Sequence, residues 1–390
     1  MQKTNSTGNA TEHTLKISNA NYFLETEDSK TLNCNRESIK SITIDCSGWQ
    51  AGREYAIKDS MFKDFSLLEK VEFKDSAHIK FAKIGKEAFK KCKKLREICS
   101  DSDMSNCLRL YEIGNKAFFG CKELQSFPNV DLYRDIKIGD QAFCDCLALR
   151  NVRINGRVDT KIKIDIGKEA FSRCGKLESV GLSNAKITVG AGAFKECKNL
   201  INFNLTNSFI TSNISVEAFH SCEQLKEFTC ALQEETEKNE VCIGFKAFAS
   251  CDKLEKVHVT VINNEQSGRH TVKVGKKAFQ PKFTEQGSSL CEFALIIECA
   301  STDIEIVTFN ESCFYNCVKL TDIKIDLKCQ PQDCNFVFER FSLHGCQSAE
   351  ICGQKFGVIF SDADKTAEDI YQYNNYIFSN NVFENQTGEE

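Results

Sequence analysis

One acidic stretch of the sequence carries oxygen ligands at the spacing of a calcium loop. Asp101, Asp103, Ser105 and Glu112 occupy positions 1, 3, 5 and 12 of that template, in which carboxylate and hydroxyl oxygens coordinate the hard cation. Position 6 is Asn106 where the template has glycine, and the flanking residues predict a strand and a repeat start instead of two helices. We therefore favour an acidic loop between repeats and keep calcium binding as the weaker alternative.

The other residue types that carry out chemistry form no catalytic pattern. The sequence contains no Gly-x-Ser-x-Gly or His-Glu-x-x-His motif, and its six histidines are scattered. Gly-Lys pairs recur without the upstream glycine and the following Ser or Thr of a phosphate loop. A formal net charge of −5 argues against a strongly basic nucleic-acid binder. We expect no enzymatic activity, no cofactor and no nucleic-acid ligand.

The 22 cysteines make the chain cysteine-rich, yet their spacing does not predict a zinc site. No Cys-x-x-Cys pair occurs, and no histidine stands at finger-like spacing from a cysteine pair. Nine cysteines recur at one position of a repeat, where a free thiol packs as a small hydrophobe: Cys92, Cys121, Cys146, Cys174, Cys197, Cys222, Cys251, Cys317 and Cys346. The others are expected in strands and loops, where some could pair in an oxidising compartment.

All of these residues are positioned by copies of one phrase, Ile-Gly-x-x-Ala-Phe-x-x-Cys-x-x-Leu-x-x-Val-x-Leu. The eleven copies begin at Ile57, Ile84, Ile113, Ile138, Ile166, Val189, Ile214, Ile243, Val274, Phe309 and Phe338. The step from the opening residue to the cysteine is always eight residues, and the segment after the last aliphatic residue varies in length. A short unit repeated in this way predicts a solenoid whose insertions are loops.

Each copy predicts a helical turn followed by a strand. Ala88, Cys92 and Leu95 are spaced i, i+4 and i+7, like the apolar stripe of a short helix. Val152 and Ile154 alternate with polar residues, as in a strand. The repeat glycine allows a tight bend or a positive φ. The repeat phenylalanines are expected to form one buried column, and the insertions to be hairpin-like.

The phrase resembles the repeat of the BspA-like leucine-rich repeat proteins, over residues 38–352. The resemblance implies an α/β repeat fold, a curved leucine-rich-repeat solenoid of about eleven units. It also implies adhesion and protein binding at the cell surface. An intracellular scaffold or effector that binds a protein partner is the alternative function.

Alternate residues of each strand are expected on the concave sheet face of such a solenoid. The partner-binding candidates on that face are Asn151, Arg153, Asn202, Asn204, Glu227 and His258. The inter-repeat loops, in particular 260–272 and 280–289, are the alternative contact surface. We expect a monomer that binds a protein ligand of unknown identity.

The chain divides into four predicted parts. Residues 1–14 are expected to be disordered, 15–56 to form an N-terminal cap, 57–352 the solenoid, and 353–390 a C-terminal cap with an acidic tail. Within the last part, Thr366 to Phe378 predict a short helix. No stretch has the length of a signal sequence core or a membrane span, which favours the cytoplasm, whereas the resemblance favours the cell surface.

Overall fold

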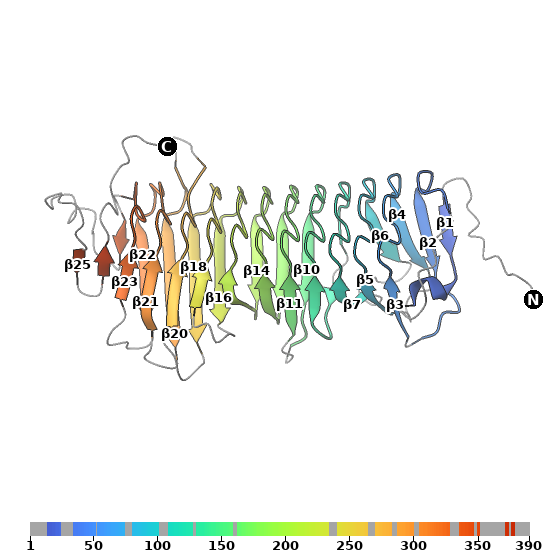
Figure 1. Ribbon diagram of the computed structural model, residues 1–390, viewed down its shortest axis with the longest axis horizontal. Helices are drawn as coiled ribbons and strands as arrows, with labels where there is room; N and C mark the ends of the chain where they lie inside the picture. Colours follow the sequence, from blue (N-terminus) through green and yellow to red (C-terminus); the bar gives the residue numbers. More distant parts are fainter. Residues whose placement is uncertain are drawn as a thin grey trace, which may run out of the picture. The chain divides into compact units, whose positions relative to one another are not determined.

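The computed structural model divides the chain into two compact units, residues 1–185 (unit 1) and 186–390 (unit 2), each built mainly of short parallel strands (Figure 1). The structure describes residues 14–24, 34–51, 53–74, 80–100, 108–127, 130–158, 162–233, 240–263, 270–282, 287–299, 304–327, 335–346, 349–351, 371–373 and 376–378. Two ladders of strands run through each unit. The leucine-side ladder holds the strands after the repeat leucine, and the isoleucine-side ladder holds those that end at the opening aliphatic residue.

Unit 1 has its leucine-side strands in two runs of parallel pairs, β1-β2-β4-β6 and β8-β10-β12. Their bounds are β1 Thr14–Ile17, β2 Ser41–Asp45, β4 Lys70–Lys74, β6 Glu97–Ser100, β8 Val130–Asp131, β10 Asn151–Asn155 and β12 Ser179–Ser183. The isoleucine-side strands pair in order. They are β3 Glu54–Ile57, β5 Lys80–Ile84, β7 Leu108–Ile113, β9 Ile136–Ile138 and β11 Lys163–Ile166.

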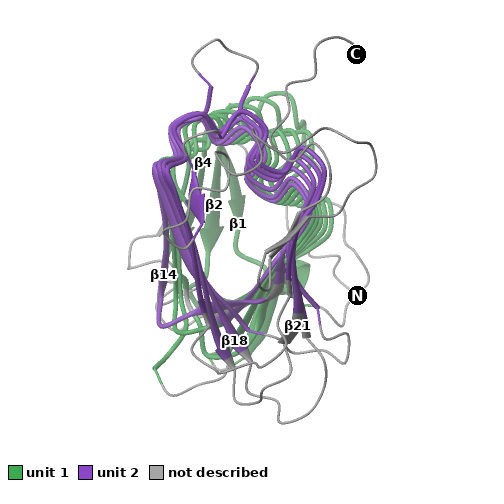
Figure 2. Cartoon of the chain, turned by 90° about the vertical axis from the view of Figure 1, so that its left-hand side faces the viewer, with its two compact units in different colours: residues 1–185 green, residues 186–390 purple. Residues whose placement is uncertain are grey.

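Unit 2 repeats this plan, and Figure 2 shows its two ladders as separate walls with the turns between them at one edge. The leucine-side strands are β14 Asn202–Thr206, β16 Glu227–Gln233, β18 Lys256–Asn263, β20 Glu292–Cys299, β22 Asp322–Leu327 and β24 Glu350–Ile351. The isoleucine-side strands are β13 Lys186–Val189, β15 Phe209–Ile214, β17 Glu240–Ile243, β19 His270–Val274, β21 Ile304–Phe309, β23 Asn335–Phe338 and β26 Tyr376–Phe378. Each unit is therefore a stretch of leucine-rich-repeat solenoid.

The prediction of a helical turn in each repeat is wrong, because the segment between the ladders is a run of tight turns. In the second copy, the Ala88 N–H bonds the Gly85 carbonyl at 3.3 Å, three residues back. The Phe89 N–H instead donates to the Ala117 carbonyl of the next repeat at 2.7 Å. Glu87 has a φ of 57°, which no α-helix contains. Within the described residues, the one helical segment is the 3₁₀ turn η1, Ala20–Phe23.

The helical interpretation failed because two structures share one spacing. Turns that advance four residues place Ala88 and Cys92 on the same side, just as successive turns of a helix do. A helix, however, uses its N–H groups within its own segment. In this chain alternate N–H groups bond the neighbouring repeat, so the turns stack like a third ladder.

The repeat glycines are required by close approach between repeats. A Cβ on Gly139 would lie 2.3 Å from Asn115 Oδ1 and 2.5 Å from the Asn115 backbone nitrogen. No side chain fits in that space, and Gly139 is absent from the positive-φ residues. The sequence predicted a tight bend or a positive φ at this glycine, whereas the close approach of the neighbouring repeat is what requires it here.

The phenylalanine column is confirmed within each unit. In unit 1, neighbouring rings of Phe89, Phe118, Phe143 and Phe171 stack with centroids 5.0–5.1 Å apart. In unit 2, stacked neighbours lie 5.2–5.4 Å apart along Phe194, Phe219, Phe248, Phe279 and Phe314. Each of these rings is at most 3% exposed. The column gives each unit a continuous core that no single repeat could bury.

The repeat cysteines form a second buried column beside the rings. The thiols donate to the carbonyl of a repeat phenylalanine one copy earlier, as Cys92 does to Phe62 at 3.0 Å and Cys121 to Phe89 at 3.1 Å. No disulfide joins the cysteines whose side chains the structure describes. Packing, rather than pairing, is therefore the role of this column.

The C-terminal helix predicted between Thr366 and Phe378 is also wrong where the chain is described. Tyr373 ends strand β25, Tyr371–Tyr373, and Phe378 ends β26, which pairs in parallel with β23. Strand β25 pairs with β26 in antiparallel fashion. Adding a strand pairs the backbone groups that the edge of β23 would otherwise leave open. The cap boundaries at 15–56 and 353–390 stay predictions.

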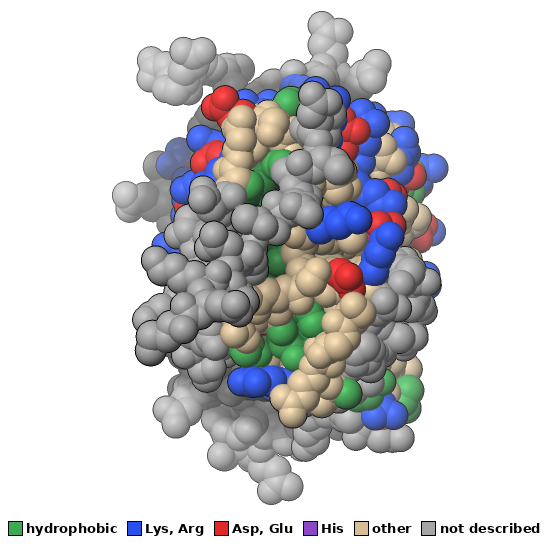
Figure 3. Space-filling model, turned by 90° about the vertical axis from the view of Figure 1, so that its right-hand side faces the viewer, with side chains coloured by type: hydrophobic (Ala, Val, Ile, Leu, Met, Phe, Trp, Pro, Cys, Tyr) green, Lys and Arg blue, Asp and Glu red, His purple; other side chains and the backbone are tan. Residues whose placement is uncertain are grey.

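The N-terminal end of unit 1 is closed by packing around one tryptophan. The Trp49 ring lies 5.1 Å from Phe23 and 4.9 Å from Tyr55, and its Nε1 donates to the Ser18 carbonyl at 2.8 Å. Figure 3 views this end, where apolar side chains appear along the middle and charged side chains along the upper and right margins.

Candidate functional site

In unit 1, the predicted site residues lie on the outward face of strand β10. Asn151 and Arg153 are exposed, and they alternate with Val152 and Ile154, which are buried in the core. On the neighbouring strand β12, Ser179 and Gly181 stand opposite them. Arg153 therefore projects from a surface of small neutral residues, which leaves room for a chain to lie along it.

In unit 2, the predicted residues lie on three leucine-side strands. Asn202 and Asn204 are exposed on β14, on either side of buried Phe203. Glu227 begins β16 and is exposed, while His258 is half-buried on β18. The structure thus places all six predicted residues on outward faces, two of them in unit 1 and four in unit 2.

A charged network in unit 2 includes His258 and three residues that the sequence-based selection missed. His258 Nε2 lies 3.1 Å from Glu292 Oε1, and Lys324 Nζ lies 3.0 Å from the same oxygen. Lys324 Nζ also lies 3.0 Å from Asp322 Oδ2. The hydrogen bond from Lys324 is the largest cause of the lowered pKa of Glu292, followed by partial burial, which opposes it. These residues occupy the same outward rows as the predicted ones, so strand register was the signal that could have found them.

The acidic residues considered for calcium are only partly described. Asp101, Asp103 and Ser105 lie outside the described residues. Glu112 lies on β7, where its Oε2 is 3.2 Å from Lys83 Nζ. Over the part of the chain that the structure describes, no three His, Cys, Asp or Glu side chains gather as a metal site would require. Calcium binding remains an untested alternative.

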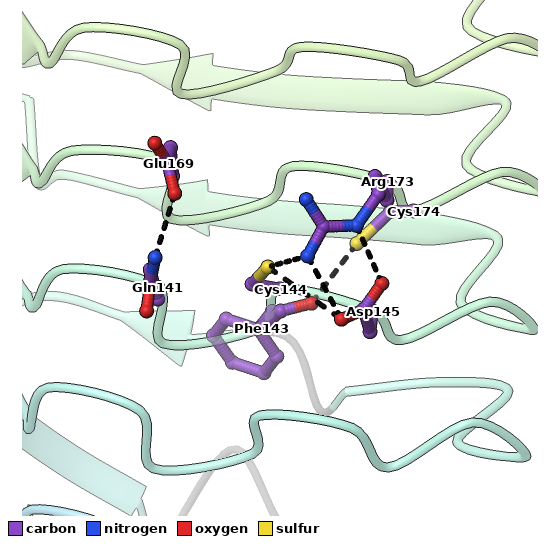
Figure 4. Close-up of polar contacts among 7 residues, drawn as sticks. All are labelled: Gln141, Phe143, Cys144, Asp145, Glu169, Arg173 and Cys174. Atoms are coloured by element: carbon purple, nitrogen blue, oxygen red, sulfur yellow. Dashed lines mark hydrogen bonds and ion pairs between the residues drawn. The ribbon is translucent and has the colours of Figure 1, made fainter.

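The turn segments of unit 1 carry side-chain links between repeats (Figure 4). The Arg173 guanidinium bonds Asp145 Oδ1 at 2.7 Å and Cys144 Sγ at 3.1 Å. Beside it, Gln141 donates to Glu169 at 2.6 Å. The hydrogen bond from Arg173 lowers the pKa of Asp145, and burial raises the pKa of the Cys144 thiol to about 11. A buried, protonated thiol is a poor nucleophile, and the contacts of this cluster join neighbouring repeats.

One serine lies beside a histidine in unit 2. Ser221 Oγ is 3.0 Å from His220 Nδ1, and burial lowers the pKa of that imidazole. The acid near this pair, Glu217, is bound by Lys195 Nζ at 2.7 Å. A nucleophile requires a base that a third group orients, and here the carboxylate is engaged by a lysine. The pair does not form a triad.

The repeat is matched by a family model. The model for the BspA type leucine rich repeat region matches six copies, over residues 55–163, 102–226, 136–280 and 243–354. The chain belongs to the BspA-type leucine-rich repeat family. Leucine-rich repeats of this family are typical of protein-binding modules, and such stacked repeats present extended binding surfaces. Among curated proteins, none matches the chain.

Several solved structures similar to this BspA-type chain are leucine-rich repeat proteins. A protein from T. pallidum is 23% identical, with 48% of this chain and 78% of that chain covered and a TM-score of 0.32. One from Bacteroides ovatus is 20% identical, with 87% and 80% covered and a TM-score of 0.35. A leucine rich cell surface protein from Faecalibacterium prausnitzii is 16% identical, with 81% and 84% covered and a TM-score of 0.24.

None of the helical segments among the described residues has the length and apolar character needed to cross a membrane.

Proposed function

We propose that this chain is a non-enzymatic, adhesion-type protein-binding module whose partner contacts the outward face of its leucine-side strands. The observation that carries the proposal is the contrast between the two faces of those strands. Inward positions repeat as buried aliphatic or aromatic residues, as Val152 and Ile154 do. Outward positions such as Arg153 and His258 follow no repeat. A constant scaffold with a variable, exposed face is suited to recognition of one polypeptide.

A capture experiment tests the face. Purified chain is immobilised, incubated with lysates of its own cells and of candidate hosts, and compared with the variant Asn151→Ala, Arg153→Ala, Asn202→Ala, Asn204→Ala. Because these four side chains are exposed, the variant is expected to keep its thermal transition and to lose its captured partner. Recovery of the same proteins by both chains would refute the face as the binding site.

A matched control carries four substitutions on exposed turn residues. Lys93→Ala, Lys94→Ala, Lys122→Ala and Lys176→Ala remove four side chains away from the leucine-side strands. This control is expected to capture the partner as the unaltered chain does. If the control loses the partner and the face variant keeps it, binding belongs to the turns.

The loop predicted at 260–272 is shorter than the sequence indicated, because residues 260–263 belong to β18 and 270–272 to β19. The segment between these strands and residues 280–289 are the other contact surface within this proposal. They are described only in part, so their role is tested by exchange. Replacing residues 264–269 by a Gly-Ser linker of equal length leaves strands β18 and β19 intact. Loss of the partner in this variant alone would assign binding to the loop.

A second candidate function is an intracellular scaffold or effector that uses the same face. The free thiols favour it, because half-buried cysteines such as Cys99, Cys242 and Cys291 persist unpaired most readily in a reducing compartment. Alkylation of intact cells, followed by mass spectrometry, measures their state. Oxidised Cys99 and Cys291 would contradict the intracellular alternative.

A further inference from the structure

Four neighbouring leucine-side strands of unit 2 are longer than their counterparts in unit 1. Strands β16, β18, β20 and β22 have 7, 8, 8 and 6 residues. Strands β4, β10 and β12 of unit 1 have 5 residues each. The added residues extend each strand past the last aliphatic position of the repeat phrase. On β16, β18 and β20 they supply outward positions that the unit 1 strands lack, those of Gln233, Ile262 and Glu298.

The fifth position of these strands, which the unit 1 strands share, and the added positions beyond it bring apolar side chains together. Ala231 on β16 stands opposite Thr260 on β18, and Thr260 stands opposite Ile296 on β20. Ile262 lies two residues along β18 on the same side, because successive side chains alternate between faces. Ala231, Ile262 and Ile296 are all partly exposed. The alternate residues point inward and are at most 3% exposed: Leu232, Val261 and Ile297.

Carboxylates border this apolar group. Glu298 stands opposite Ile262, and Asp326 stands opposite Ile296. We call the outward positions of β16, β18, β20 and β22 the widened face. Its charged residues are Glu227, Glu292, Glu298, Asp322, Asp326, Lys256 and Lys324. Five acids against two lysines leave a net charge of −3 with His258 neutral.

One of the two lysines of the widened face is engaged in ion pairs within it. Lys324 Nζ is shared by Glu292 and Asp322 at 3.0 Å each. Lys256 stands between Glu227 and Glu292 in the strand register. The face therefore presents an apolar centre with an acidic border, which attracts cationic groups and repels phosphates.

We infer that the widened face binds an extended polypeptide segment in which an apolar side chain is flanked by lysine or arginine. The inference rests on the proposed protein-binding function and names the chemistry of the partner. The apolar side chain packs against Ile262 and Ile296, where burial of apolar area drives association. The flanking cations reach Glu298 and Asp326, and this complementarity sets specificity and encounter rate.

The size of the face sets the length of a test peptide. Four strands about 4.8 Å apart span roughly 14 Å, and an extended chain advances about 3.3 Å per residue. About five residues therefore cross the face. The basic probe is a labelled peptide of about ten residues, with a central Leu flanked at alternate positions by Lys and with Thr elsewhere. The acidic probe replaces each Lys by Glu, and the polar probe replaces Leu by Ser.

Fluorescence anisotropy with the full chain and a charge-reversed variant tests the inference. The unaltered chain is expected to bind the basic probe and to bind the acidic probe at least about tenfold more weakly, because of charge complementarity. Glu298→Lys with Asp326→Lys is expected to reverse that order. The polar probe is expected to bind the unaltered chain about tenfold more weakly than the basic probe does. The variant Ile262→Ser with Ile296→Ser is expected to bind the basic probe about tenfold more weakly than the unaltered chain does.

The control carries the same charge change on exposed acids of unit 1. Glu123→Lys with Glu178→Lys disrupts two surface ion pairs and is expected to leave the preference for the basic probe intact. Equal binding of the basic probe by the charge-reversed variant and the unaltered chain would overturn the inference, as would absence of binding. If the peptides fail while the face variant still loses its captured partner, the partner chemistry is wrong and the proposed function stands. If the peptides do not bind and the face variant also keeps its captured partner, the proposed function is refuted as well.

Discussion

Removing one ring from the middle of the aromatic column of unit 2 should be among the most damaging single changes to this chain. Phe219 is 0% exposed. It stacks between Phe194 and Phe248 at 5.4 and 5.3 Å, and it meets the edges of Phe203 and Phe228 at 4.9 and 5.0 Å. Truncating a buried Phe to Ala costs about 3–5 kcal/mol. The four ring contacts place Phe219→Ala in the upper part of that range, about 4–5 kcal/mol.

Urea unfolding of the full chain, followed by circular dichroism, measures this change. The control is Phe245→Ala in the same unit, because the Phe245 ring is 39% exposed and its removal should cost less than about 1 kcal/mol. A loss below about 2 kcal/mol for Phe219→Ala would refute the column as the main source of stability. An equal loss in both variants would refute the difference in burial on which the argument depends.

Three further predictions concern a repeat glycine, a repeat cysteine and two cysteines outside the repeat position. Gly139→Ala should lower the unfolding free energy by about 1–3 kcal/mol because its Cβ meets Asn115, whereas Gly181→Ala, with open space around it, should cost nothing; urea unfolding compares the two. Cys121→Ala should cost about 1 kcal/mol in the same assay, since it removes the thiol bond to a core carbonyl; no loss would show that the bond contributes nothing. Burial raises the pKa values of Cys144 and Cys242 to about 11, so their unfolded forms lose protons first and stability should fall between about pH 9 and 11; a melting temperature that is constant over this window would contradict it.

The repeat was sufficient to predict the stacked architecture and its core. Phe89 and Cys92 recur at fixed positions, and fixed positions in a solenoid face the neighbouring repeat. The path of the backbone between these two residues was harder to predict. Residues four apart occupy one side in a helix and in a run of tight turns alike, so side-chain spacing could not separate the two. The positive φ of Glu87 has no marker in its residue type.

The sequence was sufficient to predict which strand face holds the candidate site, but not all of the residues that lie on that face. Alternation along a strand was enough to place Asn151, Arg153 and His258 on outward faces. The lengths of β16, β18 and β20 were not predictable from the phrase, because the phrase ends where the extra residues begin. Ile262 was therefore assigned to the insertion 260–272, although it lies on β18 two residues from Thr260, and Ile296, opposite Thr260, was not recognised as a surface residue.

The inward and outward residues of each leucine-side strand are under different structural constraints. The outward residues are therefore the ones in which we expect binding specificity. An inward residue such as Val259, 1% exposed, must fit the copies on both sides, so its identity follows from stacking alone. An outward residue such as Glu298 meets no such requirement, and its charge is free to serve a partner. Because β16, β18 and β20 add outward residues in consecutive repeats, the apolar centre and the acidic border of the widened face lie together by register. The partner chemistry that we infer therefore follows from the outward residues that do not repeat.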